Sequence, residues 1–260
     1  MTALVNSSAQ HRSQFWCLRA MSPLQLALQD AIFTSLSGES SLERSPDEHY
    51  ECEMRLGFHD QKRFNARVDA VQWYGAFELL AKSDTYAVGG CDAPPECSAI
   101  LRRRVERGAH YDSRGSFRTR HGDGERAERC RAVWKKKSEL PPRDFLSARG
   151  AHVRLAVARE IRLREAECSG PRCAVGPDAL LTERRSLRFQ RAPNWRVDFT
   201  RINDGEEYQI EIELCVRRAL EHNRTANELA ETGAFVLQRV QTALFNAARR
   251  HAALCADCIR

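Results

Sequence analysis

The sequence predicts an α+β fold in which about eight to nine antiparallel strands close into a barrel flanked by helices. Segments that alternate polar and apolar residues run through most of the stretch from 48 to 216, and helical spacing is found before it, from 22 to about 36, and after it, from 218 to about 254. Charged side chains recur on one face of many of these strands. A sandwich would bury one face of each strand in hydrocarbon, whereas a barrel whose apolar faces pack outward on helices can enclose the charged faces.

Three helices are expected. The first begins at Ser22-Pro23, with proline in its first turn and leucines at helical spacing, and ends in the Gly- and Ser-rich stretch 37–41. The second covers 69–82. The third runs from 218 to about 254, where apolar residues recur at intervals of three, four and seven, and Gly233 is a candidate position for a break or kink in it.

The strands fill the remainder of the chain. They are expected at 48–57, 63–68, 99–106, 115–120, 130–137, 151–163, 180–189, 194–201 and 207–216. Residues 1–20 are expected to form a loose leader, and the inserts 89–96 and 168–178, rich in Gly, Pro and Cys, are expected to be surface loops. We expect one domain overall: a leader and helix at 1–44, the barrel at 45–217, and a helix packed on it at 218–260.

Composition narrows the class of protein. The net charge of +6 favours a polyanionic partner. The ten cysteines complete no four-ligand zinc pattern. The sequence has no apolar signal core and no apolar run long enough to span a membrane, so we expect an intracellular protein with reduced thiols and no membrane partner. A Gly-rich phosphate loop followed by Lys and Ser/Thr is missing, which argues against a Walker-type nucleotidase. The His-Cys-x5-Arg signature is also missing, which excludes a cysteine phosphatase.

Two Glu-x-Glu segments carry the functional signal. Alternation places Glu51, Glu53 and Arg55 on one face of the first strand, and Glu211 and Glu213 on one face of the last. The strands between them carry Arg and Lys at the same period of two. Acidic strands beside basic strands predict one enclosed polar site, in which carboxylates hold a divalent cation and basic groups hold phosphate.

These segments resemble the three signature motifs of the fungal and protozoal RNA triphosphatases, the metal-dependent mRNA capping enzymes of the triphosphate tunnel metalloenzyme group. The matching motifs are Glu51-x-Glu53-x-Arg55-Leu56-Gly57, Arg196-x-Asp198-x-Thr200 and Glu211-x-Glu213. Intervening segments follow the same order: Arg63–Val68, Arg118-Thr119-Arg120, Trp134–Lys137, Arg154–Glu160 and Glu183–Ser186. The resemblance covers roughly residues 45–216. Arg55 stands where relatives that act on polyphosphate or thiamine triphosphate often have Lys, which favours the RNA-directed branch.

The resemblance implies a role for each matched residue. Mg²⁺ or Mn²⁺ would be bound by Glu51, Glu53 and Glu213, and Glu211 would help to orient the attacking water. Phosphate oxygens would be held by Arg118, Lys135, Lys137, Arg154, Arg184 and Arg196. Asp198 and Glu160 would orient these cations. The residues expected to act in catalysis are Glu51, Glu53, Glu211, Glu213, Arg196 and Lys135.

Two of these assignments depend on strand register, because a slip of one residue reverses the face. We choose Lys135 over Lys136, and Arg184 over Arg185. No histidine is assigned to catalysis.

The activity implied is hydrolysis of the γ-phosphate of triphosphate-ended mRNA, giving diphosphate-ended RNA in the first step of capping. The expected partners are the 5′-triphosphate end of nascent mRNA and an RNA guanylyltransferase, with no DNA, and the expected location is the nucleus. One alternative is a tunnel hydrolase acting on inorganic triphosphate or free nucleoside triphosphates. Another is a non-catalytic tunnel that binds polyphosphate or inositol phosphate, which would need the basic strands but not four acids.

Overall fold

The computed structural model describes residues 22–41, 45–60, 63–88, 96–106, 109–117, 130–146, 151–168 and 180–258. It contains helices α1 (Pro23–Glu39), α2 (Ala70–Ala81), α3 (Val216–Glu221) and α4 (Ala226–Cys258). Its longer strands are β1 (Glu48–Asp60), β4 (Glu96–Glu106), β5 (Ala109–Phe117), β6 (Cys130–Glu139), β8 (His152–Cys168), β9 (Leu180–Phe189), β10 (Ala192–Ile202) and β11 (Glu207–Leu214). Three short strands join them: β2 (Arg63–Asn65), β3 (Thr85–Ala87) and β7 (Arg143–Phe145).

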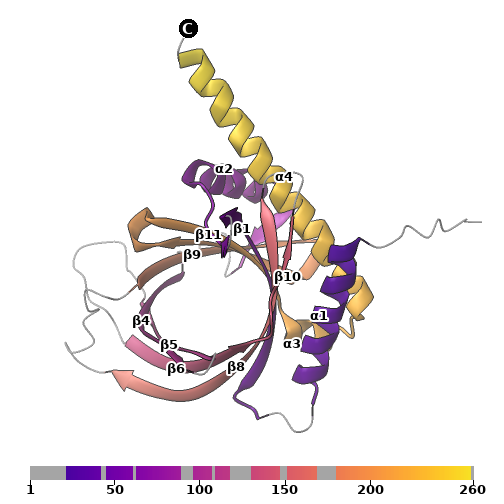
Figure 1. The fold of residues 1–260 in the computed structure, drawn as a ribbon, viewed down its shortest axis with the longest axis vertical. Coiled ribbons are helices and arrows are strands. Elements are labelled where there is room, and N and C mark those ends of the chain that lie inside the picture. Colours follow the sequence, from indigo (N-terminus) through magenta and orange to yellow (C-terminus); the bar gives the residue numbers. More distant parts are fainter. Residues whose placement is uncertain are drawn as a thin grey trace, which may run out of the picture.

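The strand pairings follow the order β1-β11-β10-β9-β4-β5-β6-β8 and are all antiparallel. The last strand of this path, β8, also pairs with β1 along ten residues of β1, from Glu48 to Gly57. Figure 1 shows these strands curving around a common centre, with the helices outside them. The expected α+β class and antiparallel sheet are confirmed.

The apolar faces of β1, β10 and β11 form the core together with the helices. Cys52, Met54 and Leu56 on β1 are fully buried, and so are Ile210 and Ile212 on β11. The same cluster contains residues of all four helices, among them Leu28, Trp73, Val216 and Val240. Since side chains alternate along a strand, packing of this face on the helices turns the charged residues of β1 and β11 to the opposite face.

Local signals set the start of each helix. Ser22 and Gln25 form a reciprocal capping box, with Pro23 in the first turn of α1. Asp69 caps α2 by accepting the backbone N–H of Val71 at 2.8 Å. Both starts agree with the predicted boundaries to within one residue.

The single helix expected from 218 to 254 is two helices. α3 ends at Glu221, and the chain turns through Asn223, which has a left-handed backbone conformation with φ of 51°. Thr225 and Glu228 then cap each other's backbone N–H groups and start α4. The Thr-x-x-Glu capping box was the sequence signal for this second start.

Gly233 neither breaks nor ends α4, which continues through it to Cys258. A β-carbon at this position would lie 2.6 Å from Cζ2 of Trp195. Trp195 is fully buried and donates its Nε1 hydrogen to the carbonyl of Leu229 at 3.1 Å. The glycine therefore allows α4 to pack closely on β10. Beyond this contact the C-terminal part of α4 projects past the strands (Figure 1).

Other differences are smaller. β3 and β7 were not expected, and the predicted strand at 63–68 is limited to Arg63–Asn65. β5 begins at Ala109, before the predicted 115. The predicted leader, almost all of both predicted loops and residues 118–120 lie outside the described residues. Within the described chain, no helix combines the length and apolar character needed to cross a membrane.

Gly233→Val tests the contact between α4 and β10. The added side chain must displace a fully buried Trp195 ring, so we expect the free energy of unfolding to fall by about 2 kcal/mol or more. Ala252→Val, at an exposed position of α4, should cost only about 0.5 kcal/mol, the loss of helix propensity. Urea unfolding of both variants measures the difference, and equal midpoints would contradict the packing described.

Candidate active site

The polar faces of β1 and β11 bring the two Glu-x-Glu segments together. Glu53 lies directly opposite Glu213, and Arg55 opposite Glu211. Directly opposed residues in an antiparallel pair share a face and lie close together. The two ends of the chain therefore contribute to one acidic surface, as the sequence predicted.

Lys137 reaches this acidic surface from β6. Its Nζ lies 2.8 Å from Oε2 of Glu51 and 3.3 Å from Oε1 of Glu53. β8 lies between β6 and β1, and the residues of β8 opposite these two glutamates are Ala158 and Ala156. Because alanine side chains are small, the lysine can pass over them.

Arg55 contacts three carboxylates from three strands. It donates to Glu53 on its own strand, its Nη2 lies 3.6 Å from Glu139, and its Nε lies 3.2 Å from Glu211. The Nε–H is not directed at Glu211, so that nitrogen has an ion pair but no hydrogen bond. Burial lowers the pKa of Arg55, but the surrounding carboxylates outweigh it and raise the pKa overall.

A second network surrounds Asp198 on β10, whose side chain is 1% exposed. Arg196 donates to Asp198 through Nε and to Glu213 through Nη2, the latter at 2.6 Å. Ser186 donates its hydroxyl to Asp198 at 2.6 Å, and Nη1 of Arg184 lies 3.5 Å away. Asp198 thus holds two of the expected phosphate-binding arginines in place.

The register of β9 separates Arg184 from Arg185. Arg184 faces Asp198, whereas the guanidinium of Arg185 lies over the ring of Phe77 on α2, 5.6 Å from its centroid, and contacts Glu183. The structure therefore turns Arg184 toward the polar face and Arg185 toward the helices.

Arg154 is oriented differently from the other expected phosphate-binding residues. It makes a bidentate contact with Asp144 of β7 at 2.7 and 2.8 Å, and it stacks on Phe64 of β2. In register it lies opposite Arg55. Its guanidinium is thus already held by a carboxylate at the end of the site where β2 and β7 join the sheet.

The remaining predicted residues are less fully defined. Glu160 is buried and lies opposite Lys137 in the β6–β8 pairing. Lys135 lies two residues before Lys137 in β6, opposite Arg162, and its side chain lies outside the described part. Arg118 lies outside the described residues altogether.

Burial and neighbouring negative charges raise the pKa values of two of the glutamates. Burial is the main factor that raises the pKa of Glu53 to about 7, with Glu211 adding to it and Lys137 and Arg55 opposing it. Burial likewise raises the pKa of Glu213 to about 8, opposed by Arg196 and reinforced by Glu51, Asp198 and Glu53. The attraction of Glu53 and Glu51 outweighs burial at Lys137 and raises its pKa. Two glutamates thus resist ionisation despite their basic neighbours.

Among the described side chains, no group of three or more His, Cys, Asp or Glu stands in a position to hold a metal ion. The expected ligands Glu51, Glu53 and Glu213 are paired with basic side chains instead. Binding of a cation would require these carboxylates to turn from Lys137, Arg55 and Arg196 toward one another.

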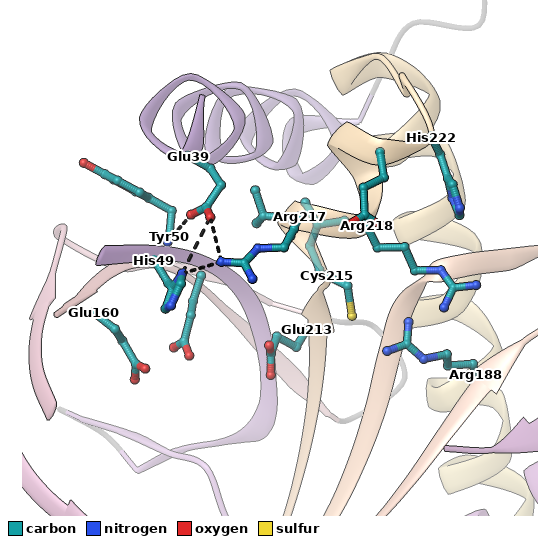
Figure 2. A pocket seen from close by; sticks show the side chains of 14 residues that line it. Glu39, His49, Tyr50, Glu160, Arg188, Glu213, Cys215, Arg217, Arg218 and His222 are labelled. Carbon is teal, nitrogen blue, oxygen red and sulfur yellow. Dashed lines mark hydrogen bonds and ion pairs between the residues drawn. The ribbon is translucent and has the colours of Figure 1, made fainter. Parts of the chain in front are cut away.

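A pocket of about 580 Å³ opens at the end of the sheet where β1 begins and β11 ends. It is lined by Glu51 and Glu213 from these strands, by Glu160 and Arg188, and by Cys215, Arg217, Arg218 and His222 at and around α3. In Figure 2, Glu213 lies at the edge toward the strands, and the α3 residues form the opposite wall. The acidic surface is therefore reached from this pocket.

Several residues of these networks were not assigned from the sequence. Glu139 follows Lys137 at the same period of two, so alternation could have identified it. Ser186 is likewise two residues from Arg184. Asp144 lies in a three-residue strand that gave no periodic signal.

Comparison with known proteins rests on structure alone, since no family model matches the chain and no curated protein matches it. Two structures of the S. pombe RNA triphosphatase Pct1 are similar. The complex with the Spt5 CTD has a TM-score of 0.54 and 15% identity, covering 85% of this chain and 92% of that one. Pct1 by itself has a TM-score of 0.54 and 13% identity, covering 86% and 93%.

The triphosphatase of the Mimivirus capping enzyme is also similar, with 10% identity and coverage of 84% and 96%, but its TM-score of 0.43 is too low for us to draw a conclusion from it. The structural similarity to Pct1 shows a shared fold. Because the sequence identity is this low, the activity has to be argued from the site.

The raised carboxyl pKa values predict how stability depends on pH when divalent cations are removed with a chelator. In the unfolded chain Glu53 and Glu213 titrate near 4.5, but in the folded protein near 7 and 8. Between these values the folded state holds protons that the unfolded state has released, so this contribution makes stability fall as pH rises from about 4.5 to about 8.

Melting temperatures across this range measure the effect. The double variant Glu53→Gln, Glu213→Gln has side chains of the same shape that do not titrate. Its melting temperature should therefore fall less steeply with rising pH than that of the wild type. An unchanged decline would show that these two groups do not titrate in this way.

Proposed function

We propose that the protein is a metal-dependent RNA 5′-triphosphatase that removes the γ-phosphate from triphosphate-ended mRNA and leaves a diphosphate end. The observation that carries this proposal is the polar face shared by β1, β11 and β10, which Lys137 reaches from β6. On it, carboxylates from the first and last strands meet Lys137 from β6 and the Arg196–Asp198–Arg184 network. The fold shared with S. pombe Pct1, an RNA triphosphatase, supports the same activity.

The donor set suits a hard divalent cation. Carboxylate oxygens are the ligands that Mg²⁺ and Mn²⁺ prefer. Burial is the main cause of the raised pKa values of Glu53 and Glu213, and the basic groups nearby do not offset it, so a further cation would stabilise the ionised carboxylates. Glu51, Glu53 and Glu213 would hold the cation, which would supply charge neutralisation at the γ-phosphate and a lowered pKa for a bound water.

The basic residues would bind the triphosphate. Arg196 and Arg184 are held by Asp198, so their guanidinium groups keep fixed positions for bidentate contact with phosphate oxygens. Lys137 is partly buried between two carboxylates and would act as a point charge once they turn to a cation. We retain Arg118, Lys135 and Arg154 as further phosphate-binding candidates, and Arg154 would have to leave Asp144 to take part.

Glu211 would position the attacking water. It lies opposite Asp198 on β10 and Arg55 on β1, and its ion pair with Arg55 fixes its carboxylate beside Glu53. Transfer of a phosphoryl group to water depends mainly on positioning and charge stabilisation. A carboxylate that accepts a hydrogen bond from water is suited to this task.

We further propose that the strands enclose a tunnel for the triphosphate, that the protein acts in the nucleus, and that its product passes to an RNA guanylyltransferase. Hydrolysis of inorganic triphosphate or free nucleoside triphosphates is the competing activity, since the same residues would bind those substrates. The four glutamates argue against a site that only binds polyphosphate, because carboxylates repel a polyanion unless a cation lies between them.

The central test is release of labelled phosphate from γ-labelled triphosphate RNA, with Mg²⁺, with Mn²⁺ and with chelator. We expect metal-dependent release that Glu213→Gln reduces about 100-fold or more, since it removes an expected metal ligand. Glu78→Gln makes the same change at an exposed position of α2 and should retain full activity. Parallel assays with ATP and inorganic triphosphate rank the substrates, and absence of metal-dependent release would overturn the proposal.

Adjacent arginines of β9 provide a matched test of the phosphate-binding face. Arg184→Lys should reduce turnover by about tenfold or more, because an ammonium group cannot reproduce a bidentate guanidinium contact. Arg185→Lys keeps its charge on the helix side, near Phe77, and should leave turnover unchanged. Steady-state phosphate release compares the two, and the reverse ranking would mean that the functional face of β9 is the other one.

A further inference from the structure

Arg188 on β9 is a buried cation that has no carboxylate partner among the described residues. It is 9% exposed, and its Nη1 donates to the carbonyl oxygen of Pro193 at 2.7 Å. Within the described residues no Asp or Glu forms an ion pair with it, in contrast to Arg55, Arg184 and Arg196 nearby. A buried guanidinium with only a neutral partner is energetically unfavourable, so this position favours an anion.

Arg218 provides a second cation at the same place. It belongs to α3, is exposed, and lines the same pocket as Arg188. Figure 2 draws both guanidinium groups on one side of the pocket, beyond Cys215 as seen from Glu213. In the part of the chain that the structure describes, Arg218 forms no ion pair either, whereas its neighbour Arg217 lies 4.0 Å from Glu39.

Five carboxylates line the pocket, and among the described residues none of them forms an ion pair with Arg188 or Arg218. They include Glu160, on β8, and Glu221, which is exposed at the end of α3 three residues after Arg218. Glu213 is paired with Arg196 and Glu51 with Lys137. Glu39 accepts the backbone N–H of Tyr50 at 2.9 Å and lies near His49 and Arg217. Arg188 and Arg218 thus form a positive region that continues the pocket away from the candidate metal ligands.

We propose that Arg188 and Arg218 form a separate phosphate subsite at this end of the pocket. It would bind a phosphodiester group of the RNA beyond the 5′-terminal nucleotide, or the orthophosphate that the reaction releases. The shared chemistry is a tetrahedral phosphate anion, which two guanidinium groups can contact through several charge-assisted hydrogen bonds. The role of the subsite rests on the proposed function. A phosphodiester occupant would give the enzyme a preference for RNA over inorganic triphosphate.

The experiment uses two probes that need no turnover. A short fluorescent oligoribonucleotide with a 5′-hydroxyl end reports phosphodiester binding by anisotropy, and inorganic phosphate, titrated into the protein in a calorimeter, reports binding of the product. Arg218→Gln is the main variant because this side chain is exposed. Arg250→Gln removes the same charge from an exposed position of α4 and is the control.

We expect Arg218→Gln, but not Arg250→Gln, to weaken binding of one probe roughly tenfold. Weaker oligoribonucleotide binding, with the slope of log binding constant against log salt concentration reduced by about one, identifies a phosphodiester as the occupant of the subsite. Loss of orthophosphate binding, with oligoribonucleotide binding unchanged, identifies the product. Arg188→Lys should weaken binding of the same probe. If this variant does not fold, the result for Arg218→Gln alone decides whether the subsite exists.

Equal binding by Arg218→Gln and Arg250→Gln, or no binding of either probe by the wild type, would overturn the subsite. The two proposals can fail separately. A protein that binds the probes but releases no phosphate from any triphosphate retains the subsite and loses the proposed function. One that turns over RNA while Arg218→Gln matches its control retains the function and loses the subsite.

Discussion

The structure depends on the need to neutralise carboxylates that its core packing forces inward. β1 and β11 must turn Cys52, Met54, Ile210 and Ile212 toward the helices, because this is the face that the core buries. Alternation then leaves Glu53 and Glu213 opposite each other on the polar face. Acids this close and this shielded from water cannot all remain ionised unless cations lie beside them. Lys137, Arg55 and Arg196 supply part of that positive charge, and the pKa values of Glu53 and Glu213 nevertheless stay raised.

This constraint explains residue choices some distance from the glutamates. Ala156 and Ala158 on β8 are small where Lys137 must cross to β1. Asp198 is buried where it can hold Arg196 and Arg184 together. Gly233 lets α4 reach Trp195, which belongs to the same strand as Arg196 and Asp198 and packs the apolar side of that strand on the helix. The helices therefore act on the site indirectly, by setting which face of each strand is polar.

Much of this could be predicted from the sequence because period-two alternation decides both the strand and its face. The face that carries Lys137, and the choice of Arg184 over Arg185, follow from it. The meeting of the two Glu-x-Glu segments was expected from the family resemblance, and the register of β1 and β11 brings them together. The bidentate capture of Arg154 by Asp144 could not be predicted, since a three-residue strand has no detectable period. The break between α3 and α4 depends on Asn223 and a capping box, local features that apolar spacing does not register.

The claim on which the account rests is that β1 and β11 form one cation site. Calorimetric titration of the protein with Mn²⁺ tests it most directly, using the wild type, Glu51→Gln from β1 and Glu213→Gln from β11. We predict one strong site per chain in the wild type and loss of that site in each variant, although the two residues lie at opposite ends of the sequence. Undiminished binding of Mn²⁺ by either variant, or none by the wild type, would contradict the account.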